Sequence, residues 1–375
     1  MSKVALLTWY DNENYGTALQ AFALQKSINR KMKCEIIKYK TPFGGYGIDY
    51  MLDPVLRRDL LYKIYDHTIM KVHKNAYIER EKERRMKMED FFNNKLVFSP
   101  YNVNAENISV LNQYYDRFVC GSDQIWNPNN FDGHFYLDFV TDDNIRIAYA
   151  PSFGVASIID EVQCKTIHEL LKKFNYLSIR ESAGKKIIED IAERDCDICL
   201  DPTLLLDRSD WEKLADESTI TLPSQYVFTY LLGRNHRNLK KSKIVANTLK
   251  KNMLVQPYYL PDYVNGEEIV SPSGPADFLN AIRNSSFVCT DSFHGTIFAI
   301  LFRKPFVLFS RFNSKNRSSQ NSRVESLLNL VGLSERLDFN NIYSKTALLD
   351  MSFTNCEKSI ELERKRSLEY LYNAL

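Results

Sequence analysis

The chain alternates short apolar runs with longer stretches of helical periodicity. Apolar runs within 3–10, 34–40 and 225–233 are bounded by polar residues, which is typical of buried parallel strands. Helical stretches such as 17–31 and 239–252 lie between such runs. This alternation predicts doubly wound parallel sheets joined by crossover helices. The expected fold class is therefore α/β.

The alternation pauses between residues 207 and 224 and then restarts. Because 375 residues are too many for one ordinary core, we expect two Rossmann-like domains that face a cleft. We place the N-terminal domain at 1–207, the C-terminal domain at 208–340 and a closing helical tail at 341–375.

A long, charged helical segment at about 57–92 interrupts the first domain. Leu60, Leu61 and Ile64 give it a partial apolar stripe, and Lys and Arg crowd the other positions. The favoured interpretation is a helical insertion packed on the first domain. Docking of this basic segment on an anionic membrane surface or on a partner is the alternative.

Charge and cysteine content narrow the class of protein. Lys and Arg number 49 against 47 Asp and Glu, so the overall charge predicts no nucleic-acid partner. The N-terminus is typical of a strand and not of a signal peptide, and the seven cysteines are scattered, so we expect a cytoplasmic protein. Cys196 and Cys199 lie in a predicted strand at odd spacing, which directs their thiols to opposite faces. No second cysteine pair completes a metal site.

Polar residues gather in loops that follow the predicted strands, where open α/β sheets bind their ligands. Any one of these loops could be ordinary turn chemistry, but six of them in one chain predict a shared cleft. The loops are DNENYGT at 11–17, GSDQIWNP at 121–128, APSFG at 150–154, RESAG at 180–184, DPT at 201–203 and TDSFHGT at 290–296.

Through these motifs, over about residues 3–335, the chain resembles the polysaccharide pyruvyl transferases. The resemblance implies a GT-B-like fold, with the tail returning to the first domain. It also implies transfer of pyruvate from phosphoenolpyruvate onto two hydroxyls of a sugar, as a cyclic ketal. Phosphoenolpyruvate is then the donor substrate, the first domain holds the acceptor, and we expect neither a cofactor nor a metal.

The TDSFHGT motif is predicted to bind the phosphate of phosphoenolpyruvate. A helix that begins after Ser292 directs free N–H groups and a positive dipole end at an anion, and a His in its first turn adds donors. Several relatives carry an Arg where this chain has Ser292, so other cations must assist. The residues predicted to bind phosphoenolpyruvate are Arg180, Ser292, His294, Gly295, Thr296, Arg311 and Arg323.

Ketal formation needs an acid near the methylene carbon of phosphoenolpyruvate and a base near the sugar hydroxyls. The predicted catalytic residues are His294, Asp123 and Glu181, with acid and base not separately assigned. Asp291 is expected to fix its loop or to orient His294. The predicted acceptor contacts are Asp11, Asn14, Tyr15, Gln124 and Trp126.

We therefore expect a bacterial cytoplasmic enzyme of surface polysaccharide or capsule assembly. Its acceptor is expected to be a sugar, with a lipid-linked precursor as one form, and its location peripheral at the inner face of the plasma membrane. Two alternatives stay open. One is a nucleotide-sugar glycosyltransferase of the same architecture, and the other is a non-catalytic sugar-binding protein of envelope assembly.

Overall fold

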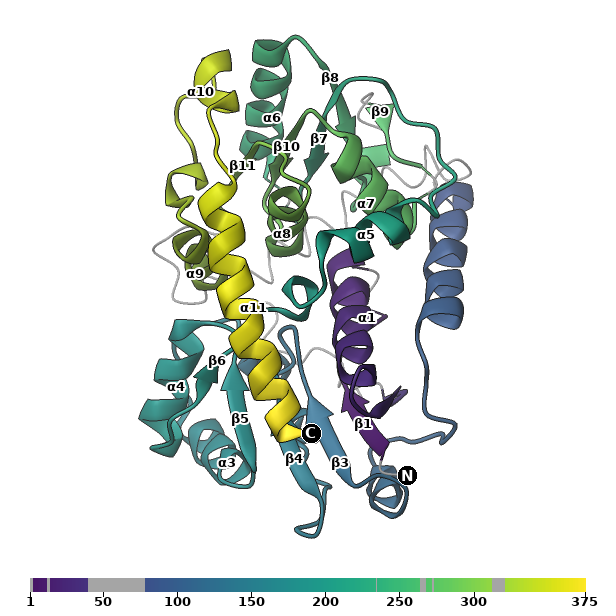
Figure 1. Cartoon of the computed structure of the whole chain (residues 1–375), viewed down its shortest axis with the longest axis vertical. Coiled ribbons are helices and arrows are strands. Elements are labelled where there is room, and N and C mark those ends of the chain that lie inside the picture. Colours follow the sequence, from purple (N-terminus) through teal and green to yellow (C-terminus); the bar gives the residue numbers. More distant parts are fainter. Residues whose placement is uncertain are drawn as a thin grey trace, which may run out of the picture.

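The computed structural model describes residues 3–11, 14–39, 78–233, 235–263, 268–271, 273–311 and 321–375. The predicted insertion at about 57–92 lies largely outside the described residues. Its described part belongs to a helix that spans 78–95. Figure 1 shows the chain as two α/β units stacked along the long axis of the molecule.

The first unit is built on a six-stranded sheet in the order β2-β1-β3-β4-β5-β6. All of its neighbouring strands pair in parallel, as expected for strands that are joined by crossover helices. Its strands are β1 (Lys3–Leu7), β2 (Lys33–Ile36), β3 (Arg117–Cys120), β4 (Ile145–Ala148), β5 (Tyr176–Ile179) and β6 (Asp197–Ile198). Its helices include α1 (Tyr15–Asn29), α3 (Glu161–Leu171), α4 (Ser182–Ala192) and the short η5 (Pro202–Leu204).

The second unit is built on a five-stranded parallel sheet in the order β11-β10-β7-β8-β9. Its strands are β7 (Tyr226–Tyr230), β8 (Asn252–Val255), β9 (Glu268–Ile269), β10 (Phe287–Thr290) and β11 (Phe306–Leu308). Its helices include α6 (His236–Leu249), α7 (Pro275–Asn284) and α8 (Phe293–Leu301). The sequence pattern missed β9, a strand of two residues, and α5 (Arg208–Ala215), which lies where the alternation pauses.

The closing segment is helical and returns to the first unit, as predicted. It contains α10 (Lys345–Leu349) and α11 (Thr354–Ala374) and follows α9 (Asn321–Val331), and α11 runs across both units in yellow in Figure 1. Tyr370 of α11 donates its hydroxyl to the Ala148 carbonyl at 3.0 Å, and Ser367 accepts the Leu200 N–H at 2.9 Å. The predicted boundary at residue 207 stays a prediction, although β6 ends at Ile198 and β7 begins at Tyr226.

The two units meet at an apolar interface, and helix α1 of the first unit forms part of it. Tyr15 of α1 is fully buried and stacks on Phe278 of α7, with ring centroids 5.0 Å apart. The hydroxyl of Tyr15 lies 2.6 Å from the Ser273 hydroxyl, so the interface also has a polar contact. The fold is therefore α/β with two facing Rossmann-like domains, as the GT-B-like prediction required. Of the helices that the structure describes, none is long and apolar enough to cross a membrane.

Candidate active site

Arg180 is the centre of a buried polar cluster between the two sheets. It follows β5 directly, at the carboxyl edge of the first sheet, and its side chain is 2% exposed. Its Nη1 donates to Asp201 Oδ2 at 2.7 Å, and Asp123 and Glu181 lie 3.9 and 3.8 Å from its other nitrogens. Among the described residues, its Nε and Nη2 have no hydrogen-bond acceptor. A buried guanidinium with unused donors can bind an anion.

Asp201 joins Arg180 to His294, and so joins the two domains. One carboxylate oxygen accepts from the Thr203 N–H and hydroxyl at 3.0 and 2.6 Å, and the other lies 3.5 Å from His294 Nε2. Burial raises the pKa of Asp201, but the charges of His294 and Arg180 outweigh it and hold that pKa below its usual range. Asp201 is therefore an anion that lies between the side chains of Arg180 and His294 and orients both.

His294 lies in the first turn of α8, whose N-cap is Ser292. The imidazole is buried, and a Cβ added at Gly16 of α1 would lie 2.2 Å from its Nδ1. Position 16 must therefore be glycine for the ring to pack here. Within the described part of the chain, His294 Nε2 has no hydrogen-bond partner of good geometry. This nitrogen faces the Asp201 carboxylate of the first domain.

The other residues of the TDSFHGT motif hold the helix start. Ser292 accepts from the Gly295 N–H at 3.2 Å, and the Thr296 hydroxyl donates back to the Ser292 carbonyl at 2.9 Å. A Cβ at Gly295 would lie 2.8 Å from the Thr290 hydroxyl, so glycine is required here for packing. Contact of Gly295 with phosphoenolpyruvate stays a prediction. Asp291 accepts from N–H groups of the loop after β7, so it fixes this loop.

Glu181 is the N-cap residue of α4 and is 1% exposed. Its Oε1 accepts the Ser152 hydroxyl at 2.8 Å, and in the described structure its Oε2 has no hydrogen-bond partner. Burial raises the pKa of Glu181, and the positive charges of Arg180 and Arg323 only partly oppose this shift. A raised pKa favours the protonated form of this carboxyl, and a protonated carboxyl can act as a proton donor.

Asp123 comes from the loop after β3 and has a left-handed backbone conformation, with φ of 65°. Its Oδ2 accepts the Thr17 hydroxyl of α1 at 2.7 Å, and its Oδ1 accepts the Gln124 N–H at 2.9 Å. The side chain is therefore fixed close to Arg180 by contacts from two elements.

Two further arginines were predicted to assist anion binding, and the structure separates them. The guanidinium carbons of Arg180 and Arg323 lie 4.8 and 5.7 Å from the centroid of the Phe293 ring. Burial and the charge of Arg180 lower the pKa of Arg323, so an anion placed here would relieve crowding of positive charge. Arg311 instead donates to the Asp291 carbonyl at 2.9 Å, on the loops of the second sheet.

A cavity of about 400 Å³ opens beside this cluster. Arg180, Asp201, Phe293 and Arg323 line it together with residues of α9 and Glu363 of α11. Its size suits a small ligand. Among the described residues, no group of three His, Cys, Asp or Glu side chains could hold a metal ion.

The predicted acceptor contacts do not lie together. Trp126 is fully buried, stacks on Tyr136 at 4.8 Å and donates to the Phe135 carbonyl, so the structure does not support its sugar contact. Tyr15 belongs to the domain interface described above and is equally enclosed. Asn14 caps α1 by accepting the Gly16 N–H at 2.9 Å.

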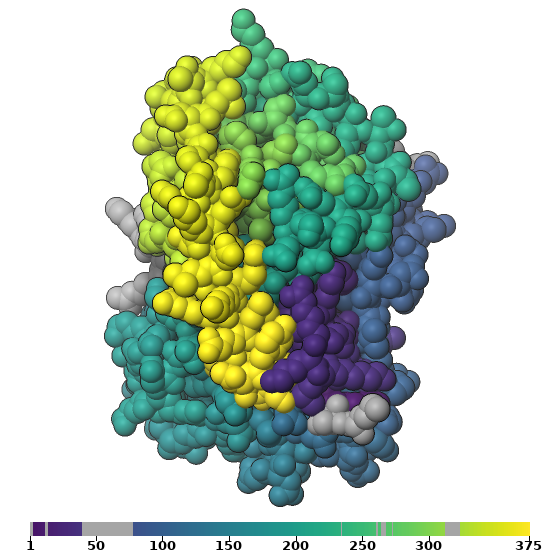
Figure 2. Space-filling model, viewed as in Figure 1, coloured from purple at the N-terminus to yellow at the C-terminus, as the bar shows by residue number. Residues whose placement is uncertain are grey.

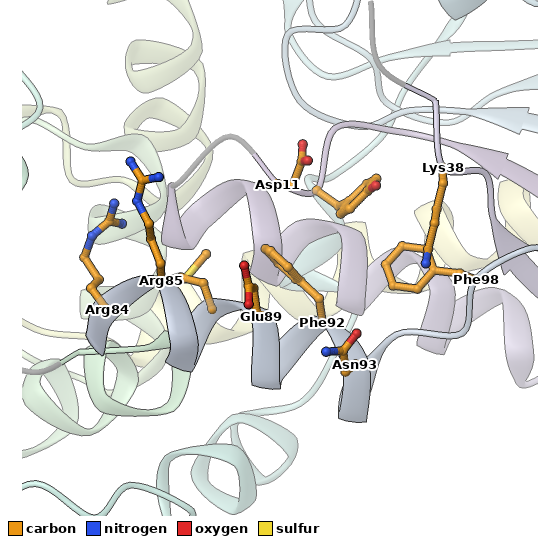
Figure 3. Close-up of a pocket in the computed structure, with 10 residues that line it drawn as sticks. Asp11, Lys38, Arg84, Arg85, Glu89, Phe92, Asn93 and Phe98 are labelled. Atoms are coloured by element: carbon orange, nitrogen blue, oxygen red, sulfur yellow. The ribbon is translucent and has the colours of Figure 1, made fainter. Parts of the chain in front are cut away.

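Asp11 and Gln124 remain accessible in part. Gln124 is half-buried, and its Oε1 accepts from Asn127 at 3.1 Å. Asp11 lines a second cavity, of about 380 Å³, between the loop after β1 and the helix at 78–95. Figure 3 shows Asp11 above the cavity and Glu89, Phe92 and Asn93 along the helix below it. Lys38 lies beside Phe98 at one end of the cavity. Aromatic and charged side chains of this helix therefore form one wall.

The sequence pattern missed three side chains of the cluster. Asp201 stands in the DPT loop after a predicted strand, and that position was a signal for it. Thr17 and Ser152 also lie in the polar loops. They donate hydrogen bonds to the carboxylates of Asp123 and Glu181, and only the structure shows these contacts.

Comparisons with known proteins concern the family and the fold of the chain. The profile of the family Polysaccharide pyruvyl transferase matches residues 14–313. No curated protein sequence matches the chain. Among solved structures, the chain is similar to UDP-GlcNAc 2-epimerase from Neisseria meningitidis bound to UDP-GlcNAc, with a TM-score of 0.50, 10% identity and 100% of each chain covered.

The Methanocaldococcus jannaschii UDP-GlcNAc 2-epimerase in complex with UDP-GlcNAc and UDP is also similar, with a TM-score of 0.50 and 12% identity over 98% of this chain and 99% of that one. At such low identity, these likenesses concern the fold alone. The family profile spans most of the chain and includes all six polar loops except the first residues of the first one. The chain therefore belongs to the polysaccharide pyruvyl transferase family.

Proposed function

We propose that the protein transfers pyruvate from phosphoenolpyruvate onto two hydroxyls of a sugar in a bacterial surface polysaccharide or its lipid-linked precursor. The observation that carries this proposal is the buried cluster of Arg180, Glu181, Asp123, Asp201 and His294, drawn from both domains. It combines cations for an anionic donor with a carboxyl of raised pKa, which is the combination that ketal formation needs.

The donor binds in the cavity beside Arg180. Phosphoenolpyruvate carries a carboxylate and a phosphate, and each suits the planar fork of an arginine. Arg180 and Arg323 flank Phe293 and both line the cavity, so Arg323 supplies the charge that relatives carry at position 292. His294 Nε2, at 3.5 Å from Asp201, donates to the phosphate as its charge grows during departure.

Glu181 is the general acid in the first step. Its O–H protonates the methylene carbon of phosphoenolpyruvate, the electron pair of the C=C bond forms the new C–H bond, and the adjacent carbon becomes cation-like. The first sugar hydroxyl adds to that carbon and loses its proton to a base. Asp123 is the base, because Thr17 and the Gln124 N–H hold its carboxylate in position.

The second sugar hydroxyl completes the ketal. The C–O bond to phosphate breaks with its electron pair on phosphate, and the second hydroxyl adds to the same carbon. Two protons leave the sugar in total. One is balanced by the proton in the new methyl group and the other by the proton on inorganic phosphate, so the step consumes no redox equivalent.

The acceptor lies on the side of the first domain. The cavity between the loop after β1 and the helix at 78–95 supports this, because Tyr10 and Phe92 offer apolar rings and Asp11 and Asn93 offer hydrogen-bonding groups for sugar hydroxyls. Figure 3 shows Asp11 on one side of this space and Phe92 and Asn93 of the helix on the other. A lipid-linked acceptor would place the enzyme at the inner face of the plasma membrane.

The test is phosphate release from phosphoenolpyruvate in the presence of a panel of galactose-type and other hexose acceptors, with mass spectrometry of the sugar. The proposal expects phosphate and a product heavier by pyruvate less water, in equal amounts. Hydrolysis or transfer from a nucleotide sugar, without consumption of phosphoenolpyruvate, would identify a glycosyltransferase instead. Binding of sugars with no turnover of either donor would identify a non-catalytic protein.

A further inference from the structure

One part of the second domain has a strongly biased charge. Residues 218–261 contain seven Lys and Arg residues and no Asp or Glu, although the whole chain has nearly equal numbers, 49 and 47. A balanced chain of this composition would place several carboxylates in a segment of that length. Positive charge is therefore concentrated locally, where the overall net charge conceals it.

The helix α6 presents much of this charge on its outer surface. Arg237, Lys240, Lys243 and Lys250 are exposed, whereas the opposite face of the helix packs Val245 and other apolar residues into the core. For Arg237, Lys240 and Lys250, no carboxylate of the described residues lies within ion-pair distance. Lys241, on the flank of the helix, lies 3.9 Å from Asp338.

Apolar side chains lie beside this basic helix. The Thr248 hydroxyl of α6 donates to the Ile342 carbonyl at 3.0 Å, which fixes the segment that leads into α10. Tyr343 in this segment is 74% exposed, and Leu349 at the end of α10 is 42% exposed. Figure 1 shows α6 and α10 next to each other at the far end of the second domain, and Figure 2 shows green and yellow atoms sharing one surface there.

We propose that this α6–α10 surface, defined by Arg237, Lys240, Lys243, Lys250 and Tyr343, binds the headgroups of an anionic lipid bilayer. Clustered Lys and Arg are attracted to anionic lipids, and an exposed tyrosine suits the interface between headgroups and water. A nucleic acid would also attract the charge. The neighbouring Tyr343 and Leu349 favour a bilayer, because its interface accepts both rings and aliphatic groups.

The inference deepens the proposed location at the membrane, and in that respect it rests on the proposed function. It also moves the contact away from the basic segment at 57–92, the alternative considered from the sequence. In the described part of that segment, Arg84 pairs with Glu81 at 2.6 Å and Lys87 pairs with Asp277 at 2.7 Å. Cations that are paired with carboxylates of the protein attract anionic lipid headgroups less strongly.

The experiment is flotation of the full chain with vesicles of phosphatidylcholine containing phosphatidylglycerol, against vesicles of phosphatidylcholine alone. Wild type should float only with the anionic vesicles and should be released at high salt. The triple variant Lys240→Glu, Lys243→Glu, Lys250→Glu should lower partitioning by about 100-fold or more. Tyr343→Ser should weaken binding that remains at moderate salt.

The matched control is Lys82→Glu, Lys173→Glu, Lys365→Glu, which changes the net charge equally at exposed positions on other elements. It should float nearly as well as wild type, and melting curves check that all variants fold. The proposal is overturned if wild type does not float, if the α6 variant floats as wild type does, or if both triple variants lose binding equally. Binding of an oligonucleotide without flotation also overturns it. No substrate is used, so these failures leave pyruvyl transfer untouched.

Discussion

Replacing Glu181 by Gln tests the assignment of the general acid. Gln has nearly the same shape, and its carbonyl oxygen can still accept the Ser152 hydroxyl that Oε1 accepts at 2.8 Å. The variant should therefore fold while lacking the proton that the methylene carbon receives. Loss of a positioned general acid reduces turnover by about 10² to 10⁴, which corresponds to about 3–5 kcal/mol of transition-state stabilisation.

The same substitution has an opposite, pH-dependent effect on stability. Burial raises the pKa of Glu181 in the folded protein above its value in the unfolded chain. The stability that the protonated carboxyl contributes is therefore fully present below the pKa of the unfolded state, and it is lost as the pH rises through the pKa of the folded state. Gln does not ionise, so the variant does not lose stability in this way. The melting temperature of Glu181→Gln, relative to wild type, should therefore increase as pH rises from about 4 towards neutrality.

The assay combines phosphate release at saturating phosphoenolpyruvate with melting curves across this pH range. Glu189→Gln is the matched control, because Glu189 lies on the same helix, is 48% exposed and only approaches Lys185 at 3.9 Å. It should leave turnover unchanged. A folded Glu181→Gln protein that turns over at the wild-type rate would refute the assignment, as would a relative melting temperature that falls with rising pH.

Four further outcomes are expected. His294→Ala should melt near wild type and lose about 10² to 10³ in turnover, as for loss of one preorganised donor; early melting with normal turnover of the folded fraction would make His294 a structural residue only. Arg323→Ala should raise the KM for phosphoenolpyruvate more than Arg311→Ala does, because Arg323 lines the cavity and Arg311 binds the Asp291 loop; the reverse order in initial-rate kinetics would contradict the cavity. Asp201→Asn should lower the free energy of unfolding at pH 7 by about 3–5 kcal/mol, as for a broken buried ion pair; because the pKa of Asp201 is depressed, the difference from wild type should shrink in urea titrations as pH falls below about 4. Gly16→Ala should reduce turnover, since a Cβ would lie 2.2 Å from His294 Nδ1, and should cost about 1–3 kcal/mol of stability by overpacking; unchanged kinetics and melting would show that the ring can move freely.

The sequence predicted the fold well because its main signals are local. Strand and helix alternation and turn residues after strands depend on near neighbours, and they located the carboxyl edges of both sheets. The returning α11 also agreed with the family resemblance. The strand β9, with two residues, is too short to carry a periodic pattern.

The site was predicted in part, for a different physical reason. Arg180, Glu181, Asp123 and His294 were identified from their loops. The contact of His294 with Asp201, however, depends on how the two domains pack, which no local pattern encodes. Trp126 illustrates the opposite error. A tryptophan in a polar loop suggests a sugar contact, yet its indole N–H is satisfied by the Phe135 carbonyl inside the core.

The proposed transfer of pyruvate from phosphoenolpyruvate to a sugar proceeds through protonation of the methylene carbon. Its most direct test is to run the reaction in deuterium oxide with the acceptor panel and to examine the sugar product by NMR and mass spectrometry. We expect a cyclic ketal whose methyl group carries deuterium from the solvent, formed in equal amount to inorganic phosphate and abolished by Arg180→Ala. Phosphate release without a ketal, or a sugar product formed from a nucleotide sugar while phosphoenolpyruvate is untouched, would contradict it.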